Sequence, residues 1–96
     1  MAAYCFFDMI EVIDPLKMEK YREGVFATVE KYHGRYLVLG GRTEVVEGSW
    51  RPTFPVMLEF PSLEQAHRWY GSPEYRPLLA LRLEATRGTA VFIEGR

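Results

Sequence analysis

The fold of this chain is decided by the stretch Pro55-Val56-Met57-Leu58-Glu59-Phe60-Pro61-Ser62. Prolines bracket a short apolar run, which is typical of a buried strand because strands tolerate proline only at their ends or edges. Side chains alternate across a strand, so Glu59 shares one face with Met57, and the even-numbered residues share the other. A carboxylate on a strand with two apolar faces needs a partner, water or a proton. Alternation alone leaves open which face of the sheet carries it.

The residues before this strand predict a strand, a helix and a second strand. Residues 4–12 are apolar on both faces, which is typical of a central strand covered on two sides. Asp14-Pro15 supplies an N-cap and a first helical residue, and we expect this helix to end with Gly34 in the left-handed conformation. Residues 35–39 predict the second strand, and residues 43–47 predict its short continuation.

The residues after the central strand predict a broken helix and a last strand. Ser62 and Gln65 fit a capping box, in which the Gln65 side chain reaches back to the backbone N–H of Ser62. Pro77 delays the second part of the helix, because proline lacks an N–H donor. Thr86-Arg87-Gly88 is expected to end it before a strand over residues 89–94.

This order of elements is that of a ferredoxin-like βαββαβ fold in the α+β class, with a four-stranded antiparallel sheet. The helices can cover only one face of such a sheet. The other face would still carry apolar side chains, among them Phe6, Met57 and Phe92. Burying such a face is worth about 25 cal/mol per Å². We therefore expect a two-fold homodimer through the open sheet face.

Composition narrows the class of protein. The 96 residues predict a single domain over residues 1–96, and the formal net charge of −1 argues against a nucleic-acid partner. No stretch approaches the roughly 20 apolar residues that span a bilayer, and no signal-peptide pattern is present, so we expect a cytoplasmic protein with no membrane partner. Cys5 is the only cysteine, which excludes an intramolecular disulfide.

A set of short segments follows an order and spacing typical of one family. The segments are Ala3-Tyr4, Asp14-Pro15, Tyr21, Gly34-Arg35-Tyr36-Leu37-Val38, Gly40-Gly41, Glu47-Gly48, Trp50-Arg51-Pro52, Leu58-Glu59-Phe60-Pro61-Ser62, Ala66, Trp69-Tyr70 and Ser72-Pro73-Glu74-Tyr75. Together they resemble the DUF1330 family, a group of small uncharacterised proteins among the dimeric α+β barrel proteins. The resemblance implies a ferredoxin-like protomer, a dimer whose two sheets form a barrel, and no settled biochemical activity.

Two residues depart from the pattern of this family. Leu39 stands where arginine is common, which removes a potential anion-binding group, and His33 replaces a small residue before Gly34. Relatives by fold include cofactor-independent monooxygenases. That link is an analogy, and a fold alone does not settle a function.

Asp8 and Glu59 are the candidate catalytic residues. If the face that carries them lines the barrel, two carboxylates from adjacent strands approach one cavity. Burial and mutual repulsion would then let one of them hold a proton and act as general acid or base near neutral pH. The alternative is structural, either an ion pair or hydrogen bond to Arg35, Arg42 or Arg51, or a wet position at the barrel mouth.

Four further residues are candidate ligand contacts: Trp50, Arg42, Tyr36 and Trp69. Trp50 lies in a predicted loop, where it would gate the cavity or, as we favour, pack against the partner subunit. Trp69 equally suits the core between helix and sheet. The sequence shows no metal-ligand spacing, no phosphate-binding glycine motif and no nucleophile–base pattern, so we predict no metal and no cofactor.

The leading hypothesis from the sequence is a small homodimeric protein that binds a small molecule, in the barrel or in a pocket between helices and sheet. Whether it is an enzyme that works without a cofactor is left open. The alternative is a structural or interaction module whose apolar sheet face serves only for dimerisation. An enclosed cavity favours the first hypothesis, and a filled, dry interface favours the second.

Overall fold

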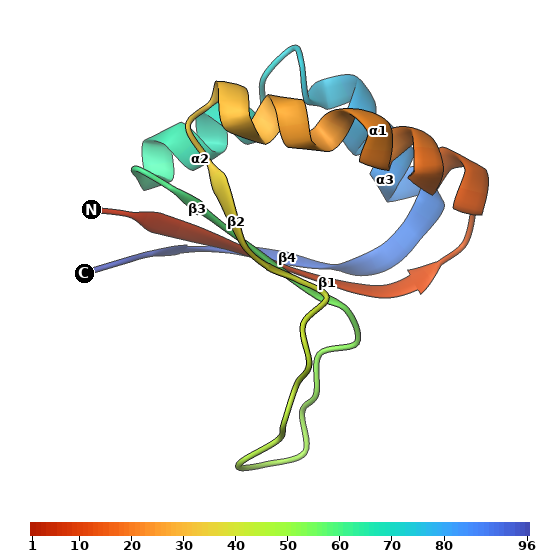
Figure 1. The fold of residues 1–96 in the computed structure, drawn as a ribbon, viewed down its shortest axis with the longest axis vertical. Helices are drawn as coiled ribbons and strands as arrows, with labels where there is room; N and C mark the ends of the chain where they lie inside the picture. The colour runs from red at the N-terminus through yellow and green to blue at the C-terminus, as the bar shows by residue number, and fades with distance from the viewer.

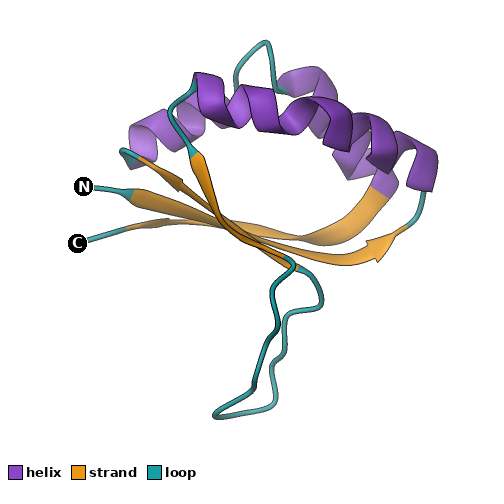
Figure 2. Ribbon diagram, in the orientation of Figure 1, coloured by secondary structure: helices purple, strands orange, loops and turns teal.

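The computed structural model describes residues 1–96 and shows one antiparallel sheet with helices on one of its faces (Figure 1; Figure 2). In chain order the elements are β1 (Ala3–Val12), α1 (Pro15–Lys31), β2 (Arg35–Leu39), β3 (Pro55–Phe60), α2 (Leu63–Tyr70), α3 (Arg76–Ala85) and β4 (Thr86–Glu94). The strands lie in the order β2-β3-β1-β4, and the predicted ferredoxin-like α+β fold is confirmed. None of the helices combines the length and the hydropathy of a membrane span.

The register of β3 settles which face each of its side chains occupies. Leu58 and Phe60 are almost wholly buried beneath the helices. Glu59 lies opposite Tyr4 of β1 and Arg35 of β2, on the face that the helices leave open. β3 is therefore an inner strand with one face in the core, and its carboxylate is on the open side of the sheet.

The start of α1 is as the sequence predicts, and its end differs. The Asp14 carboxylate accepts hydrogen bonds of 3.1 and 3.2 Å from two backbone N–H groups of the first turn, so the predicted N-cap is confirmed. After the helix, His33 rather than Gly34 adopts the left-handed conformation, with φ of +65°. Position 34 requires glycine because there is no room for a side chain: a Cβ there would lie 2.5 Å from the Phe60 ring.

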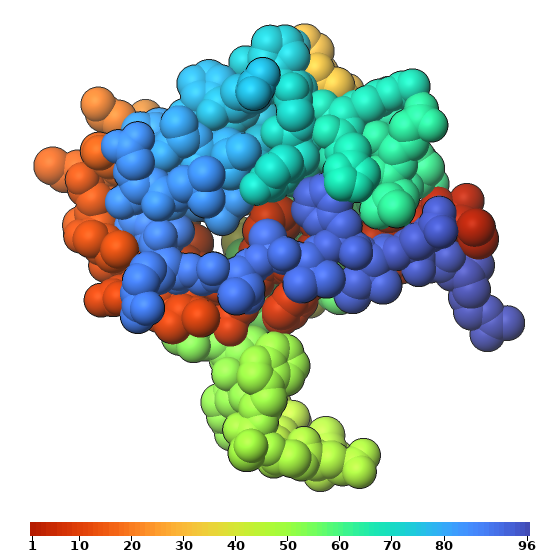
Figure 3. Space-filling model, turned by 180° about the vertical axis from the view of Figure 1, so that it is seen from behind, coloured from red at the N-terminus to blue at the C-terminus, as the bar shows by residue number.

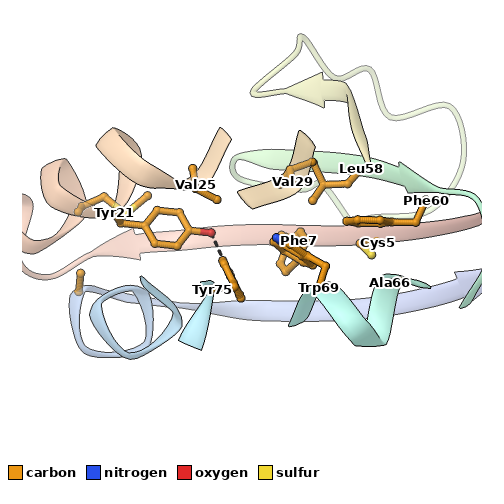
Figure 4. Close-up of a cluster of buried hydrophobic side chains, with 12 residues drawn as sticks. Cys5, Phe7, Tyr21, Val25, Val29, Leu58, Phe60, Ala66, Trp69 and Tyr75 are labelled. Carbon is orange, nitrogen blue, oxygen red and sulfur yellow. Dashed lines mark hydrogen bonds between the residues drawn. The ribbon is translucent and has the colours of Figure 1, made fainter. Parts of the chain in front are cut away.

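The core lies between helices and sheet around Trp69 of α2 (Figure 4). The centroid of the Trp69 ring is 5.3 Å from that of Phe60 and 4.2 Å from that of Tyr75. The indole Nε1 donates a hydrogen bond of 3.0 Å to Thr28 Oγ1, which satisfies the one polar atom of this buried ring. Cys5 is buried in the same cluster, and burial raises the pKa of its thiol to about 12. This cysteine therefore acts as a small apolar packing residue.

Three predictions about the strands are wrong. Residues 43–47 form no strand, because the β2–β3 ladder ends at Leu39 and these residues have no strand to pair with. β4 begins at Thr86 rather than at residue 89, since Thr86 already pairs with Val12 of β1. Phe92 lies on the helix side of the sheet, where its ring is 6.5 Å from that of Phe7.

The capping box at α2 is half correct. Ser62 Oγ accepts a hydrogen bond of 3.0 Å from the backbone N–H of Gln65, as expected for an N-cap. The Gln65 side chain does not reach back to Ser62, and its Nε2 instead donates to the carbonyl oxygen of Tyr32 at 3.0 Å. This hydrogen bond ties the start of α2 to the end of α1, because the carbonyls of a helix C-terminus lack partners within the helix.

Residues 40–54 form a long arm that extends from the sheet on the side opposite to the helices (Figure 1). Gly40, with φ of +68°, redirects the chain at the start of the arm, and its N–H donates a hydrogen bond of 2.7 Å to the Pro55 carbonyl oxygen. Farther out the arm is exposed, with 91% of Val46 and 67% of Trp50 accessible to solvent. Connections of this length without helix or strand are uncommon and usually serve a function.

The close pairing of β1 and β4 makes Gly88 a sensitive position. A Cβ at Gly88 would overlap the backbone carbonyl oxygen of Asp8, and neither strand can move without breaking the ladder. We expect Gly88→Ala to lower the free energy of unfolding by about 2 kcal/mol or more, measured by urea denaturation. Gly71→Ala is the matched control, because its Cβ would meet only the His67 carbonyl oxygen at an ordinary 3.5 Å. Equal stability of the two variants would contradict the close approach.

Candidate functional site

A cavity of about 310 Å³ lies between α1, α3 and the sheet, and 14 of its 21 lining residues are hydrophobic. Figure 3 shows a hollow in the surface between α3 and β4, and residues of both elements, Arg82 and Thr86, are among the lining residues. Small-molecule sites are typically cavities of roughly this size or larger, with mostly apolar walls and a few polar groups. The cavity therefore has the size and the lining of a binding site.

Three polar side chains form a hydrogen-bonded set at this cavity. Tyr21 of α1 and Arg82 of α3 line it, and Tyr75, which directly precedes α3, joins them. The phenol oxygens of Tyr21 and Tyr75 are 2.8 Å apart, and Figure 4 shows the two side chains pointing toward each other. Arg82 Nε donates a hydrogen bond of 3.3 Å to the phenol oxygen of Tyr75. The set brings polar groups from two helices to one wall of a mainly apolar cavity.

The guanidinium of Arg82 lacks the partners that a half-buried cation normally has. Its Nη2 atom is buried and has no hydrogen-bond partner. Each ion pair of the chain joins other residues, so no carboxylate neutralises Arg82. The ring of Phe7, 5.2 Å from Arg82 Cζ, provides a cation–π contact that offsets only part of the cost of burial. Arg82 therefore offers unused N–H donors at the cavity.

The phenols at the cavity stay protonated at neutral pH. Burial raises the pKa of Tyr36, which also lines the cavity, to about 12, and burial raises the pKa of Tyr21 as well. In Tyr75 the effect of burial outweighs the lowering by the Arg82 guanidinium, so this pKa is also raised. All three phenols therefore keep their O–H hydrogen at physiological pH, and one hydrogen of the Tyr21–Tyr75 pair is used in their mutual hydrogen bond.

Asp8 lines the cavity, but its carboxylate is committed to the backbone of the arm. The side chain is only 5% exposed, and Oδ1 accepts hydrogen bonds of 2.9 Å from the backbone N–H groups of both Thr53 and Phe54. A second bond of 3.2 Å, from the Met9 N–H to the Phe54 carbonyl oxygen, fixes the same segment to β1. Asp8 thus holds the returning end of the arm against the sheet.

Glu59 is placed away from the cavity. In the β1–β3 register it lies opposite Tyr4, whereas Asp8 lies opposite Pro55, so the two carboxylates are separated by four residues along the strands and do not share a cavity. Glu59 Oε1 accepts a hydrogen bond of 2.6 Å from Arg35 Nε. The structural alternative considered for Glu59, an ion pair with Arg35, is the arrangement observed.

The four candidate ligand contacts divide into two groups. Tyr36 and Trp69 line the cavity. Arg42 and Trp50 lie in the arm, where Arg42 forms an exposed ion pair with Glu44 at 3.5 Å. The Trp50 ring contacts Phe6 edge to face on the open side of the sheet, with centroids 6.1 Å apart. Nowhere do three or more His, Cys, Asp or Glu side chains gather as potential metal ligands.

Tyr21 and Arg82, which line the cavity, were missed by reasoning from the sequence. Tyr21 lies in the apolar stripe of α1, where a tyrosine is most simply a core residue. Arg82 stands between Leu81 and Leu83 in an apolar stretch, and that position was the available signal for a cation directed toward the interior. The convergence of the two helices at one point could not be deduced from spacing within either helix.

Comparison with models of known protein families shows which family this chain belongs to. The family model described as "Domain of unknown function (DUF1330)" matches residues 2–96. The chain belongs to the DUF1330 family. The resemblance predicted from the sequence segments is confirmed, and the description of the family assigns no activity to its members. A search of curated proteins gives no match to this DUF1330 protein.

Solved structures share the fold at low sequence identity. A protein of unknown function from Rhodopseudomonas palustris has a TM-score of 0.72 at 13% identity, covering 99% of this chain and 82% of its own. A dimeric ferredoxin-like protein of unknown function from Bacteroides fragilis has a TM-score of 0.61 at 14% identity, and the match covers 98% of this chain and 96% of that protein. SnoaB, a cofactor-independent oxygenase from Streptomyces nogalater, has a TM-score of 0.55 at 10% identity, and the match covers 99% of this chain and 91% of SnoaB. These likenesses establish the ferredoxin-like fold and nothing finer.

The role of Asp8 in this DUF1330 protein can be tested by substitution. Asp8→Ala removes the acceptor for two backbone N–H groups, each of which costs about 1–3 kcal/mol when buried and unpaired. We expect a loss of about 2 kcal/mol or more in urea denaturation. Asp8→Asn keeps an oxygen acceptor and should lose clearly less. If Asp8→Ala matched the wild type in stability, the anchoring role would be refuted.

Proposed function

We propose that this DUF1330 protein binds a small molecule in the cavity between α1, α3 and the sheet. The single observation that carries the proposal is the cavity itself, about 310 Å³ in volume and mainly apolar in lining. Interiors of proteins are normally packed with few voids larger than a water molecule, so a space of this size in a small protein calls for an occupant. The hydrogen-bonded phenols and guanidinium on one wall would fix the orientation of that occupant.

A neutral apolar dye tests whether the cavity accepts a ligand. We expect N-phenyl-1-naphthylamine to bind with enhanced fluorescence, because its rings would leave water for an apolar cavity. Val56→Trp places a large ring on the β3 wall of the cavity and should weaken binding about tenfold or more. Val46→Trp adds the same ring to an exposed position of the arm and should leave binding unchanged. Equal affinities for the two variants would place the dye elsewhere and count against the proposal.

The proposal includes a homodimer formed through the open face of the sheet. The register aligns four apolar side chains in a row across all four strands: Val38, Met57, Phe6 and Val91. Val91 and Ile93 on the edge strand are about half exposed, at 51% and 50%. A contiguous apolar face of this kind marks an interaction surface. A second copy of the same chain is the simplest partner, and structural relatives of the same fold are described as dimeric.

The arm over residues 40–54 supports the dimer proposal. It extends on the open side of the sheet, where a partner subunit would lie (Figure 1). Its exposed apolar side chains, Val46 and Trp50, have little to cover within their own chain. The Trp50 ring is already seated against Phe6, a member of the apolar row. We propose that Trp50 packs against the partner subunit, as expected for a large ring at an interface.

Charge on the open face should dissociate the dimer. Val91→Glu places a carboxylate in the proposed interface at a position half exposed in the protomer, so the protomer itself should stay folded. Sedimentation equilibrium should show a dimer for the wild type and a dissociation constant raised at least about tenfold for Val91→Glu. Leu83→Glu, at a similarly exposed position on a helix, should remain a dimer. A wild-type protein that stays monomeric at all concentrations would refute the interface.

Catalysis without a cofactor in the same cavity is the second candidate function. The observation that favours it is the placement of Tyr21 and Tyr75, linked by a hydrogen bond of 2.8 Å, at an apolar site. SnoaB, which shares the fold, is described as a cofactor-independent oxygenase. The catalytic roles of Asp8 and Glu59 stay predictions, and the contacts of both carboxylates favour structural roles.

A further inference from the structure

We infer that the cavity takes an apolar, preferably aromatic, molecule that carries one carboxylate or comparable oxyanion, and that Arg82 binds this group. The inference rests on the proposed function and goes beyond it by assigning the chemical class of the ligand. Three features of the cavity carry it: the donors of Arg82 that remain unused, the acidic residues whose hydrogen bonds go elsewhere, and the one lining arginine without an ion-pair partner.

The first feature is the set of unused donors on Arg82. A guanidinium has five N–H groups, and here its hydrogen bond to the protein is the one from Nε to Tyr75. Nη2 is buried without a partner, although buried polar atoms in native proteins nearly always have one. Carboxylates match the planar fork of arginine with two parallel hydrogen bonds. An anionic oxygen pair bound to the guanidinium would use N–H donors that the protein leaves unpaired.

The phenols add a further donor. Tyr21 and Tyr75 have two O–H hydrogens between them, and their mutual hydrogen bond uses only one. Tyr21 lines the cavity, so its hydrogen is left for a ligand when Tyr75 is the donor of the mutual bond. Tyr36, protonated because burial raises its pKa to about 12, lines the cavity too. The polar wall therefore presents hydrogen-bond donors to any molecule in the cavity.

The second feature is that the two acidic residues of the lining, Asp8 and Glu11, direct their hydrogen bonds to other parts of the chain. Asp8 accepts from the two arm amides, and Glu11 accepts a hydrogen bond of 2.9 Å from Arg87. Neither forms an ion pair or a hydrogen bond with Arg82. An arginine with unused donors and no paired carboxylate favours an anion over a cation at its side of the cavity.

The third feature concerns the magnitude of the ligand charge. Arg22 is the other arginine at the cavity, and it already pairs with Glu19 at 3.3 Å. Arg82 is left as the one uncompensated cation of the lining, so the site favours a monoanion over a doubly charged phosphate. The largely apolar walls require that the rest of the molecule be apolar, and the neighbouring rings of Phe7 and Trp69 suit an aromatic body.

Two naphthalene compounds of the same shape separate charge from apolar binding. Isothermal titration calorimetry would compare 2-naphthoate, which carries a carboxylate, with neutral 2-naphthamide. We expect the wild type to bind 2-naphthoate at least about tenfold more tightly. Arg82→Met removes the guanidinium and leaves an unbranched side chain. In this variant the preference for 2-naphthoate should disappear while 2-naphthamide still binds. Retained 2-naphthamide binding shows that the variant is folded with its cavity intact.

Arg76→Met is the matched control, because Arg76 lies exposed on the same helix and outside the cavity. It should keep the full preference for 2-naphthoate. A preference that survives in Arg82→Met, or that is lost equally in Arg76→Met, would overturn the inference. Equal binding of both compounds by the wild type would overturn it as well and leave the proposed cavity function standing. Failure of both compounds to bind the wild type would count against the cavity function itself.

Discussion

The structure depends on one constraint: the four-stranded sheet carries apolar side chains on both faces, but the helices cover only one of them. On the covered face, Leu58 and Phe60 pack beneath α1 and α2 around Trp69. On the open face, a row of apolar side chains crosses all four strands and remains partly exposed in the protomer. Burial of apolar surface is the dominant favourable term in folding and in association, so covering either face of the sheet lowers the free energy. The chain supplies one layer itself, and we assign the other to a second copy.

The space between the helices and the sheet is not uniformly filled, and the unfilled part contains polar groups that a ligand could contact. Around Trp69 the aromatic rings stack closely, and the polar atom of the indole is satisfied by Thr28. Between α1, α3 and the sheet the layers leave a cavity instead. Arg82 at this cavity holds a guanidinium with donors that no protein atom accepts. Retaining an unpaired cation there costs stability, which is understandable if a ligand completes the site.

Much of the fold could be predicted from local signals. The proline-bracketed strand, the Asp14 cap of α1 and the Ser62 cap of α2 all lie where the sequence places them, because caps and strand ends depend on neighbouring residues. The predictions that failed involve distant partners. Residues 43–47 have strand-like composition but no strand to pair with, and the Gln65 side chain finds a carbonyl on another helix. Of the candidate ligand contacts, Tyr36 and Trp69 line the cavity, whereas Tyr21 and Arg82, which also line it, were not among the candidates.

The sequence by itself determined the order of elements, the family and the excess of apolar surface, because hydrophobic periodicity, capping residues and composition are local properties of the chain. Only the tertiary structure decided what each charged group does. In the folded chain Asp8 accepts hydrogen bonds from the backbone of the arm, and Glu59 pairs with Arg35. Arg82 lies at a cavity without an anionic partner. The reason is that the partner of a charge is set by the register of strands and the packing of helices, which bring together residues far apart in the sequence.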